Sequence, residues 1–307
     1  MSRITRTVAL GAAAALALSA CGGGGDPFTG GSASPGAGGG GDGGGIVVGS
    51  ANFPESALLA EIYAGALAGA GYQVSTQLNI GSREVYFEQV ENGELAVFPE
   101  YNGGILFYLD PEATASTTEE TNAAIAEVLP DSLEILDSSA AENKDSLTVT
   151  AETAEAEDLT TIEDLEGVAQ DLTLGAPAEF ETRPQGVPGL ESTYGLTFAG
   201  FTALDPSLIA PALADGDIGV ANLFTTDPAI PANGFVVLED TENLFGAQNV
   251  TPLIHSESVD EGAREALNAV SAQLDTETLV SLVGRVVTDR EDTAEVAEDW
   301  LTSAGLA

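Results

Sequence analysis

The chain has 307 residues, of which 49 are Asp or Glu and only 8 are Lys or Arg, so its formal net charge at pH 7 is −41. A surface of that sign repels phosphate backbones, which excludes nucleic acid as a partner. The length allows one large domain or two smaller ones, and we expect two.

The amino terminus has the pattern of a secretory signal peptide, assigned to residues 1–20. Arg3 and Arg6 precede an apolar run over 8–18, which is shorter than the about 20 apolar residues that span a bilayer. The run ends in Leu-Ser-Ala-Cys, which resembles the lipobox of bacterial lipoproteins. The pattern predicts cleavage before Cys21, lipidation of Cys21, and a protein anchored at the outer face of the cell membrane.

Cys21 is the only cysteine, so no internal disulfide and no cysteine-based metal site can form. After it, 14 of the 24 residues from 22 to 45 are glycine. This segment therefore has too few apolar side chains to form an ordered structure. We expect residues 21–45 to form a lipidated, disordered tether below a folded body that begins at Ile46.

In the folded body, strand-like and helix-like segments alternate, which predicts an α/β protein with largely parallel sheets. A short apolar strand at 46–48 precedes Pro54, which suits the first turn of a helix whose apolar residues recur at helical spacing up to Ala66. The next expected elements are a strand at 74–78, a helix at 83–91 and a strand at 95–98.

A second α/β set follows Leu147, with apolar strand-like stretches at 172–174, 218–223 and 235–238. The end of the chain shows only helical periodicity, in three successive segments from Ala263 to Trp300.

No catalytic centre is recognisable. His255 is the sole histidine and follows an apolar strand-like run, so we interpret it as structural. The sequence has no G-x-S-x-G elbow, no Walker A loop, no G-x-G-x-x-G after a strand and no H-E-x-x-H. We therefore expect neither an enzyme nor a bound cofactor or metal.

Four stretches together resemble the quaternary-ammonium-binding proteins of ABC importers, which take up glycine betaine, choline and similar osmoprotectants. They are IVVGSANFPESALLAEIYAGAL at 46–67, LNIGSREVYFEQVENGELAVFPEYNGG at 78–104, LTLGAPAEFETRPQGVPGLESTYGLTF at 172–198, and ANLFTTDPAI at 221–230 with the segment 236–254. The similarity spans nearly the whole chain after the tether, in the right order.

The resemblance implies the two-lobed periplasmic-binding-protein (type II) fold, with a hinge and a ligand cleft between the lobes. We assign 46–149 plus 251–307 to lobe I and 150–250 to lobe II, with hinge strands near Val149-Thr150 and Val250-Thr251. It also implies a monomer that delivers a small-molecule ligand to separate permease and ATPase subunits.

The resemblance further implies a cage for the quaternary ammonium, which proteins hold against aromatic faces. In relatives the cage has four tyrosines. Here the matching positions are Tyr101, Asp145, Phe224 and Gln248, so only two rings remain.

The arginine that grips a ligand carboxylate in relatives corresponds to Arg183. A lysine of relatives corresponds to Ala51 and a threonine to Gly104, so two further polar residues of the relatives' site are absent here. Asn52 and Arg83 complete the set of candidate ligand-binding residues.

These departures leave the ligand open. One alternative is that the same fold binds another polar solute, such as an amino acid or ectoine. The others are a surface lipoprotein enzyme and a sensory or assembly lipoprotein that does not take part in transport.

Overall fold

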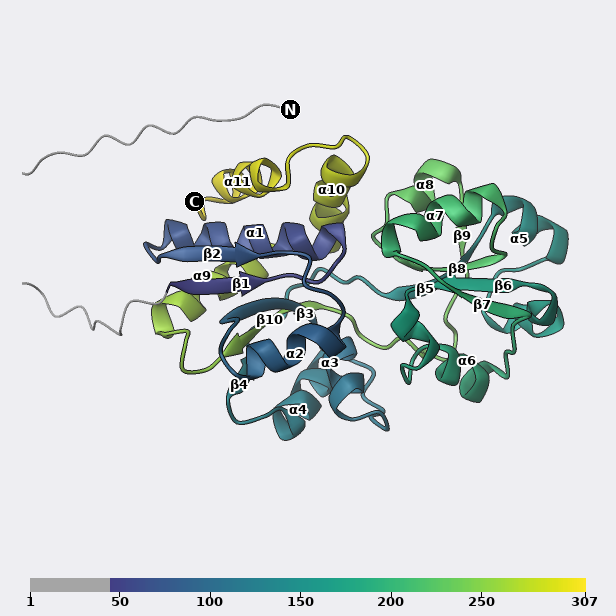
Figure 1. Cartoon of the computed structure of the whole chain (residues 1–307), viewed down its shortest axis with the longest axis horizontal. Coiled ribbons are helices and arrows are strands. Elements are labelled where there is room, and N and C mark those ends of the chain that lie inside the picture. Colours follow the sequence, from purple (N-terminus) through teal and green to yellow (C-terminus); the bar gives the residue numbers. More distant parts are fainter. Residues whose placement is uncertain (1–44) are drawn as a thin grey trace, which may run out of the picture. The chain divides into compact units, whose positions relative to one another are not determined.

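The structure is a computed structural model, and it describes residues 45–307, which form one compact unit. The predicted signal peptide, the predicted lipidation site Cys21 and nearly all of the tether lie outside the described residues. The described part has two lobes, each built on a five-stranded mixed sheet with helices packed against it (Figure 1). The predicted two-lobed α/β fold is thereby confirmed.

The first sheet has the strand order β2-β1-β3-β10-β4. Its strands are β1 (Ile46–Gly49), β2 (Val74–Gln77), β3 (Val97–Tyr101), β4 (Leu133–Ile135) and β10 (Val250–His255). Strand β1 is parallel to β2 and β3, whereas β10 is antiparallel to β3 and β4.

Seven helices belong to this lobe. They are α1 (Pro54–Gly69), α2 (Arg83–Glu91), α3 (Asn102–Leu109), α4 (Thr118–Val128), α9 (Glu261–Ser271), α10 (Thr276–Val287) and α11 (Thr293–Ala304). Most residues of helix α1 are buried, as expected of a helix enclosed by other elements. Leu58, Leu59 and Ile62 on this helix are fully buried in a core to which α9, α10 and α11 also contribute.

The second sheet has the strand order β7-β6-β8-β5-β9. Its strands are β5 (Asp145–Val149), β6 (Thr173–Ala176), β7 (Gly200–Ala203), β8 (Val220–Phe224) and β9 (Val236–Val237). Strand β6 is parallel to β7 and β8, and β5 is antiparallel to β8 and β9. Its helices are α5 (Ala151–Glu157), α6 (Val187–Tyr194), α7 (Pro206–Asp215) and α8 (Ala229–Asn233), with 3-10 turns η1 (Glu163–Gly167), η2 (Ala169–Asp171) and η3 (Ala178–Glu181).

The chain passes between the lobes twice, just before the antiparallel strand of each sheet. Strand β5 pairs with β8 from Asp145 onward, so residues 145–149 belong to the second sheet, although the sequence analysis placed them in lobe I. Val250 likewise pairs with Tyr101 in the first sheet, whereas the sequence analysis placed it in lobe II. The crossings therefore precede residues 145 and 250, because backbone pairing, which apolar patterning does not reveal, decides which sheet a strand joins.

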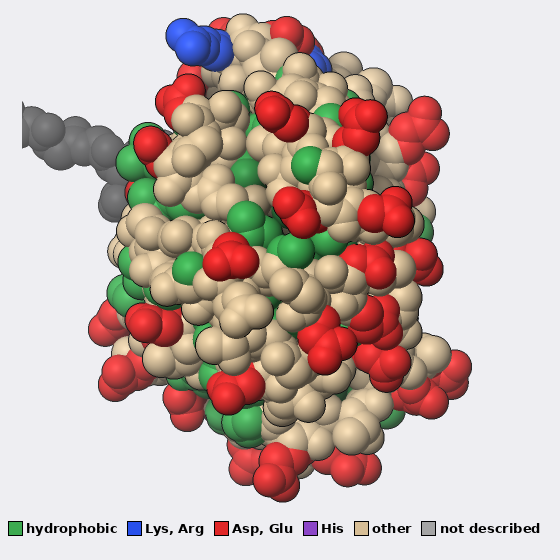
Figure 2. Space-filling model, turned by 90° about the vertical axis from the view of Figure 1, so that its right-hand side faces the viewer, with side chains coloured by type: hydrophobic (Ala, Val, Ile, Leu, Met, Phe, Trp, Pro, Cys, Tyr) green, Lys and Arg blue, Asp and Glu red, His purple; other side chains and the backbone are tan. Residues whose placement is uncertain are grey.

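Carboxylates are spread over the face of the second lobe seen in Figure 2, and Lys and Arg appear at only one edge of that view. Within residues 45–307 no helix is both long and apolar enough to cross a membrane.

Candidate functional site

A cavity of about 60 Å³ lies between the lobes, at the carboxyl ends of the parallel strands β1, β3, β6 and β8. Ligands of open α/β sheets bind at this edge. All seven candidate ligand-binding residues line it: Asn52, Arg83, Tyr101, Asp145, Arg183, Phe224 and Gln248. Since about 10 to 15 Å³ holds one water-sized group, the enclosed space suits a solute of a few heavy atoms.

Three aromatic rings contributed by both lobes meet at the cavity. Phe53 stacks on Tyr101 with ring centroids 6.3 Å apart and lies 5.3 Å from the ring of Phe224. The family resemblance pointed to Tyr101 and Phe224 but not to Phe53, because that residue does not occupy a cage position of the relatives. Its place in the first quoted stretch, in the loop after the first strand, was the available signal.

Local backbone chemistry places two of these rings. Phe53 precedes Pro54, and a residue before proline is driven to extended backbone, here φ −139° and ψ 155°, while the proline begins α1. Tyr101 ends β3 and is also the N-cap residue of α3. Each ring therefore stands where a strand or loop turns into a helix at the edge of the cleft.

Glu55 fixes the hydroxyl of Tyr101 and joins the lobes. Its carboxylate accepts hydrogen bonds from the Tyr101 hydroxyl at 2.5 Å, from Asn143 Nδ2 at 2.7 Å and from the Thr226 hydroxyl at 2.5 Å. Burial raises the pKa of Glu55, although these three bonds oppose the shift. Thr226 belongs to the second lobe, so this buried cluster connects the two lobes beside the cavity.

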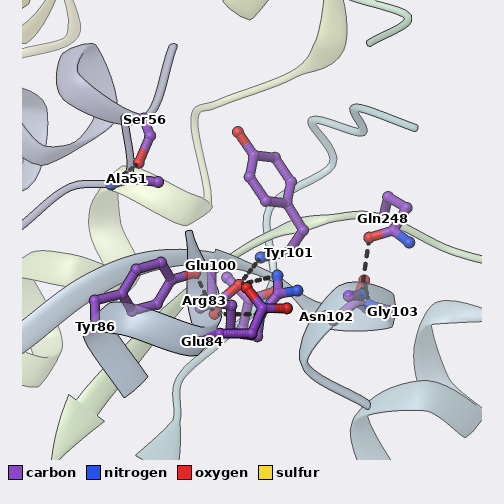
Figure 3. Close-up of polar contacts among 12 residues, drawn as sticks. Ala51, Ser56, Arg83, Glu84, Tyr86, Glu100, Tyr101, Asn102, Gly103 and Gln248 are labelled. Carbon is purple, nitrogen blue, oxygen red and sulfur yellow. Dashed lines mark hydrogen bonds and ion pairs between the residues drawn. The ribbon is translucent and has the colours of Figure 1, made fainter. Parts of the chain in front are cut away.

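Arg83 is paired within its own lobe. Its Nε and Nη2 donate to the two oxygens of Glu100 at 2.8 and 2.7 Å, and the Tyr86 hydroxyl donates to the same carboxylate at 2.7 Å (Figure 3). Arg83 is 7% exposed and Glu100 is 1% exposed. The ring of Tyr101 points away from this pair in Figure 3, and of the pair only Arg83 lines the cavity.

The two glycines after the Glu-Tyr pair make room for neighbours. A Cβ on Gly103 would lie 2.1 Å from the carbonyl oxygen of Ala247, so no larger residue fits there without backbone movement. A Cβ on Gly104 would lie 2.6 Å from Nη2 of Arg83, so the guanidinium occupies the space that a side chain at 104 would need. At the position where relatives have a threonine, this protein therefore has a glycine with the Arg83 guanidinium packed against it.

Gln248 lines the cavity but uses its amide on the backbone. Its oxygen accepts from the Gly104 N–H at 3.0 Å and its nitrogen donates to the Phe245 carbonyl at 2.9 Å. Asn52 is exposed in the loop before α1. The structure therefore places both residues at the cavity, with Gln248 holding the β3–α3 turn against the segment before β10.

Asp145 begins β5 opposite Phe224 of β8, and its carboxylate accepts a hydrogen bond from Asn222 at 3.0 Å. Burial raises the pKa of Asp145, against the opposing effects of Asn222 and the charges of Arg183 and Arg83. Its hydrogen-bond partner is a neutral amide, which leaves its charge available to a cation in the cavity.

Arg183, the candidate carboxylate clamp, reaches across the seam to the first lobe. Its Nε and Nη2 donate to the two oxygens of Glu84 on α2, at 3.1 and 3.2 Å, and Glu179 of its own lobe lies 3.9 Å from Nη2. Both guanidinium groups at the cavity are therefore paired with carboxylates of the protein.

A larger hollow of about 390 Å³ adjoins the cavity and shares part of its wall, including Phe53 and Phe224. These two rings stand between the small enclosed space and the larger one.

The arrangement is suited to binding: aromatic faces attract a cation that cannot donate hydrogen bonds, and Asp145 adds a negative charge. Among residues 45–307 no group of three or more His, Cys, Asp or Glu side chains is arranged to hold a metal ion.

Comparison with known proteins gives a family match over residues 44–303, to the substrate-binding domain of ABC-type glycine betaine transport systems. The glycine betaine-binding protein YehZ of Escherichia coli is 27% identical over 278 residues, covering 85% of this chain and 90% of the relative. A glycine-betaine-binding protein of Pseudomonas aeruginosa is 25% identical and covers 83% of this chain and 86% of its own length.

Among solved structures, a glycine betaine/carnitine/choline ABC transporter superposes with a TM-score of 0.67 at 21% identity, covering 85% of this chain and 99% of the other. That similarity supports the fold described above.

Proposed function

The chain belongs to the family of substrate-binding domains of ABC-type glycine betaine transport systems, and from that premise we propose that it captures a small quaternary-ammonium solute, such as choline or glycine betaine, for import. The ligand would lie between the lobes and stabilise the closed state through contacts to both. The chain would deliver this ligand to separate permease and ATPase subunits and catalyse no reaction itself.

One observation carries the proposal: the rings of Phe53, Tyr101 and Phe224 line one cavity between two lobes. A quaternary ammonium cannot donate a hydrogen bond, and each aromatic face attracts it by about 0.5 to 2 kcal/mol. Asp145 supports the same ligand class through its charge, and Arg183 is the group that would meet a ligand carboxylate.

The family works at the outer side of the cell membrane. We propose that this chain is held there by lipid on Cys21, with the glycine-rich tether giving the folded body a reach of about 25 to 30 Å. We further propose that it acts as a monomer, with residues near 141–145 and 248–250 as the hinge.

Calorimetric titration of the purified protein tests the ligand class. Choline, glycine betaine, carnitine, proline betaine and ectoine are compared, with a neutral amino acid as the control ligand. Binding of at least one quaternary ammonium and loss of that binding in Tyr101→Leu support the proposal. Binding of ectoine or the amino acid alone would favour the alternative of another polar solute, and heat from none of them would reject the proposed class.

A further inference from the structure

The ion pair between Glu84 and Arg183 joins residues 99 positions apart, one from each lobe. It is bidentate, with Arg183 Nε at 3.1 Å from Oε1 and Nη2 at 3.2 Å from Oε2. This two-pronged geometry is the one by which a guanidinium grips any carboxylate, including one carried by a ligand.

Arg183 is placed between two spaces. It lines the interlobe cavity and also a neighbouring hollow of about 140 Å³, and Glu84 lines only the latter. The Arg183 side chain is 22% exposed and that of Glu84 is 41% exposed, so both remain accessible to a competing group.

Glu84 is a strong competitor because it stays ionised. Burial alone would raise its pKa, but the hydrogen bonds from Arg183 and Ser82 outweigh that effect and lower the pKa to about 2. The carboxylate is therefore charged at every pH at which the protein would work.

We propose that Glu84 is a specificity-determining residue: it occupies the guanidinium of Arg183 and thereby disfavours quaternary-ammonium ligands that carry a carboxylate relative to those that carry none. This inference rests on the proposed function of the same site. A zwitterion such as glycine betaine must displace Glu84 to reach Arg183, whereas choline leaves the pair intact. From the side of the neighbouring hollow, the protein's own carboxylate thus occupies the two guanidinium nitrogens that a ligand carboxylate would use.

A ratio of affinities isolates this effect from lobe closure. The Glu84–Arg183 pair also connects the lobes, so its loss weakens the closed state for every ligand alike. The ratio of Kd for glycine betaine to Kd for choline cancels that common part and retains the competition for Arg183.

The test is calorimetric titration of the full chain and of Glu84→Gln with both probes. We expect the ratio to fall about threefold to tenfold in Glu84→Gln, the range for an ion pair of this exposure with two charge-assisted hydrogen bonds. Glu88→Gln is the matched control, because Glu88 is exposed on the same helix one turn further on. It removes an equal charge, and we expect it to leave the ratio unchanged.

A second comparison separates local competition from a general charge effect. In an Arg183→Gln background, Glu84→Gln should no longer change the ratio, since no guanidinium remains to compete for. An unchanged ratio in Glu84→Gln, an equal change in Glu88→Gln, or a change that persists without Arg183 would each overturn the inference. Failure of both probes to bind the unmodified protein would reject the inference, and failure of carnitine and proline betaine as well would reject the proposed function with it.

A spectroscopic titration gives an independent reading. If glycine betaine displaces Glu84 from Arg183, the pKa of the Glu84 carboxyl should rise above about 2 when glycine betaine binds. When choline binds, the same pKa should remain at about 2. The same pKa in both complexes would contradict the displacement of Glu84.

Discussion

The rings of Phe53 and Phe224 lie 5.3 Å apart, the first from the N-cap of α1 in one lobe and the second from the end of β8 in the other. This contact joins the lobes at the cavity and also separates the cavity from the larger hollow beside it. The same two side chains therefore contribute aromatic faces to the cavity and a contact between the lobes, and we propose these faces as part of the cation-binding surface.

Replacing either ring by leucine should weaken choline binding. Phe53→Leu or Phe224→Leu keeps most of the apolar volume and removes the π-face, a loss of about 0.5 to 2 kcal/mol or roughly twofold to thirtyfold in Kd. The neutral isostere 3,3-dimethylbutan-1-ol has the shape of choline without its charge and should lose much less. Equal losses for both ligands in calorimetry would mean that the rings contribute packing and no cation attraction.

Choline binding should strengthen as the pH rises through the pKa of Asp145. In the free protein, burial raises that pKa and the negative charge of Glu179 raises it further. The hydrogen bond from Asn222 and the positive charges of Arg183 and Arg83 lower it by less. A bound cation favours the ionised carboxylate, so the bound-state pKa is the lower of the two. The extra affinity is complete above the free-protein pKa and is lost below the bound-state pKa.

Asp145→Asn should bind choline more weakly and remove this pH dependence. The measurement is the Kd for choline from pH 4 to pH 7 in both proteins. A pH profile of the variant that parallels the unmodified protein would assign the dependence to another group.

The Arg83–Glu100 pair should be strongly coupled in stability. Glu100→Ala leaves the guanidinium of Arg83 buried without a counter-charge, which costs about 3 to 5 kcal/mol in the free energy of unfolding. The double variant Arg83→Met, Glu100→Leu should be less destabilised than the sum of the single variants, since neither charge remains. Urea unfolding measures all of these, and additive single effects would show that the two side chains act independently.

An exposed ion pair provides the comparison for the buried Arg83–Glu100 pair. Glu291→Ala removes a partner of Arg285 at the surface and should change stability far less than Glu100→Ala. A similar loss at both sites would contradict the role of burial.

Gly103→Ala should destabilise the β3–α3 turn. The added Cβ would meet the Ala247 carbonyl oxygen at 2.1 Å, a backbone contact that cannot rotate away, and overpacking of this kind costs about 1 to 3 kcal/mol. Gly167→Ala is the matched control, because a Cβ at Gly167 meets no atom within 4 Å. Thermal unfolding of the two variants compares them, and equal melting temperatures would contradict the close approach.

Much of the architecture was predictable from residue patterns. Alternating apolar strands and amphipathic helices indicated two α/β units, and the stretch after Ile46 predicted β1 and α1 closely, because local periodicity reports which face of an element is buried. The resemblance of four stretches also selected seven residues that do line one cavity. Their roles in binding remain predictions.

The exceptions depend on contacts between distant residues. Residues 145–149 have the same alternation of side chains whichever sheet they join, and only pairing with β8 assigns them to the second. The sequence shows that Gln248 carries an amide but not what the amide binds. In the structure its oxygen accepts from the Gly104 N–H and its nitrogen donates to the Phe245 carbonyl.

The sequence alone thus determined the class of fold, the family resemblance and the candidate residues, since these follow from local periodicity and motif order. The tertiary structure decided that Phe53 joins the aromatic cluster, that Glu55 links the lobes and that Arg183 is held by Glu84. Each of these pairings joins residues dozens of positions apart or more, and which carboxylate or ring comes within a few ångströms depends on how the two lobes approach.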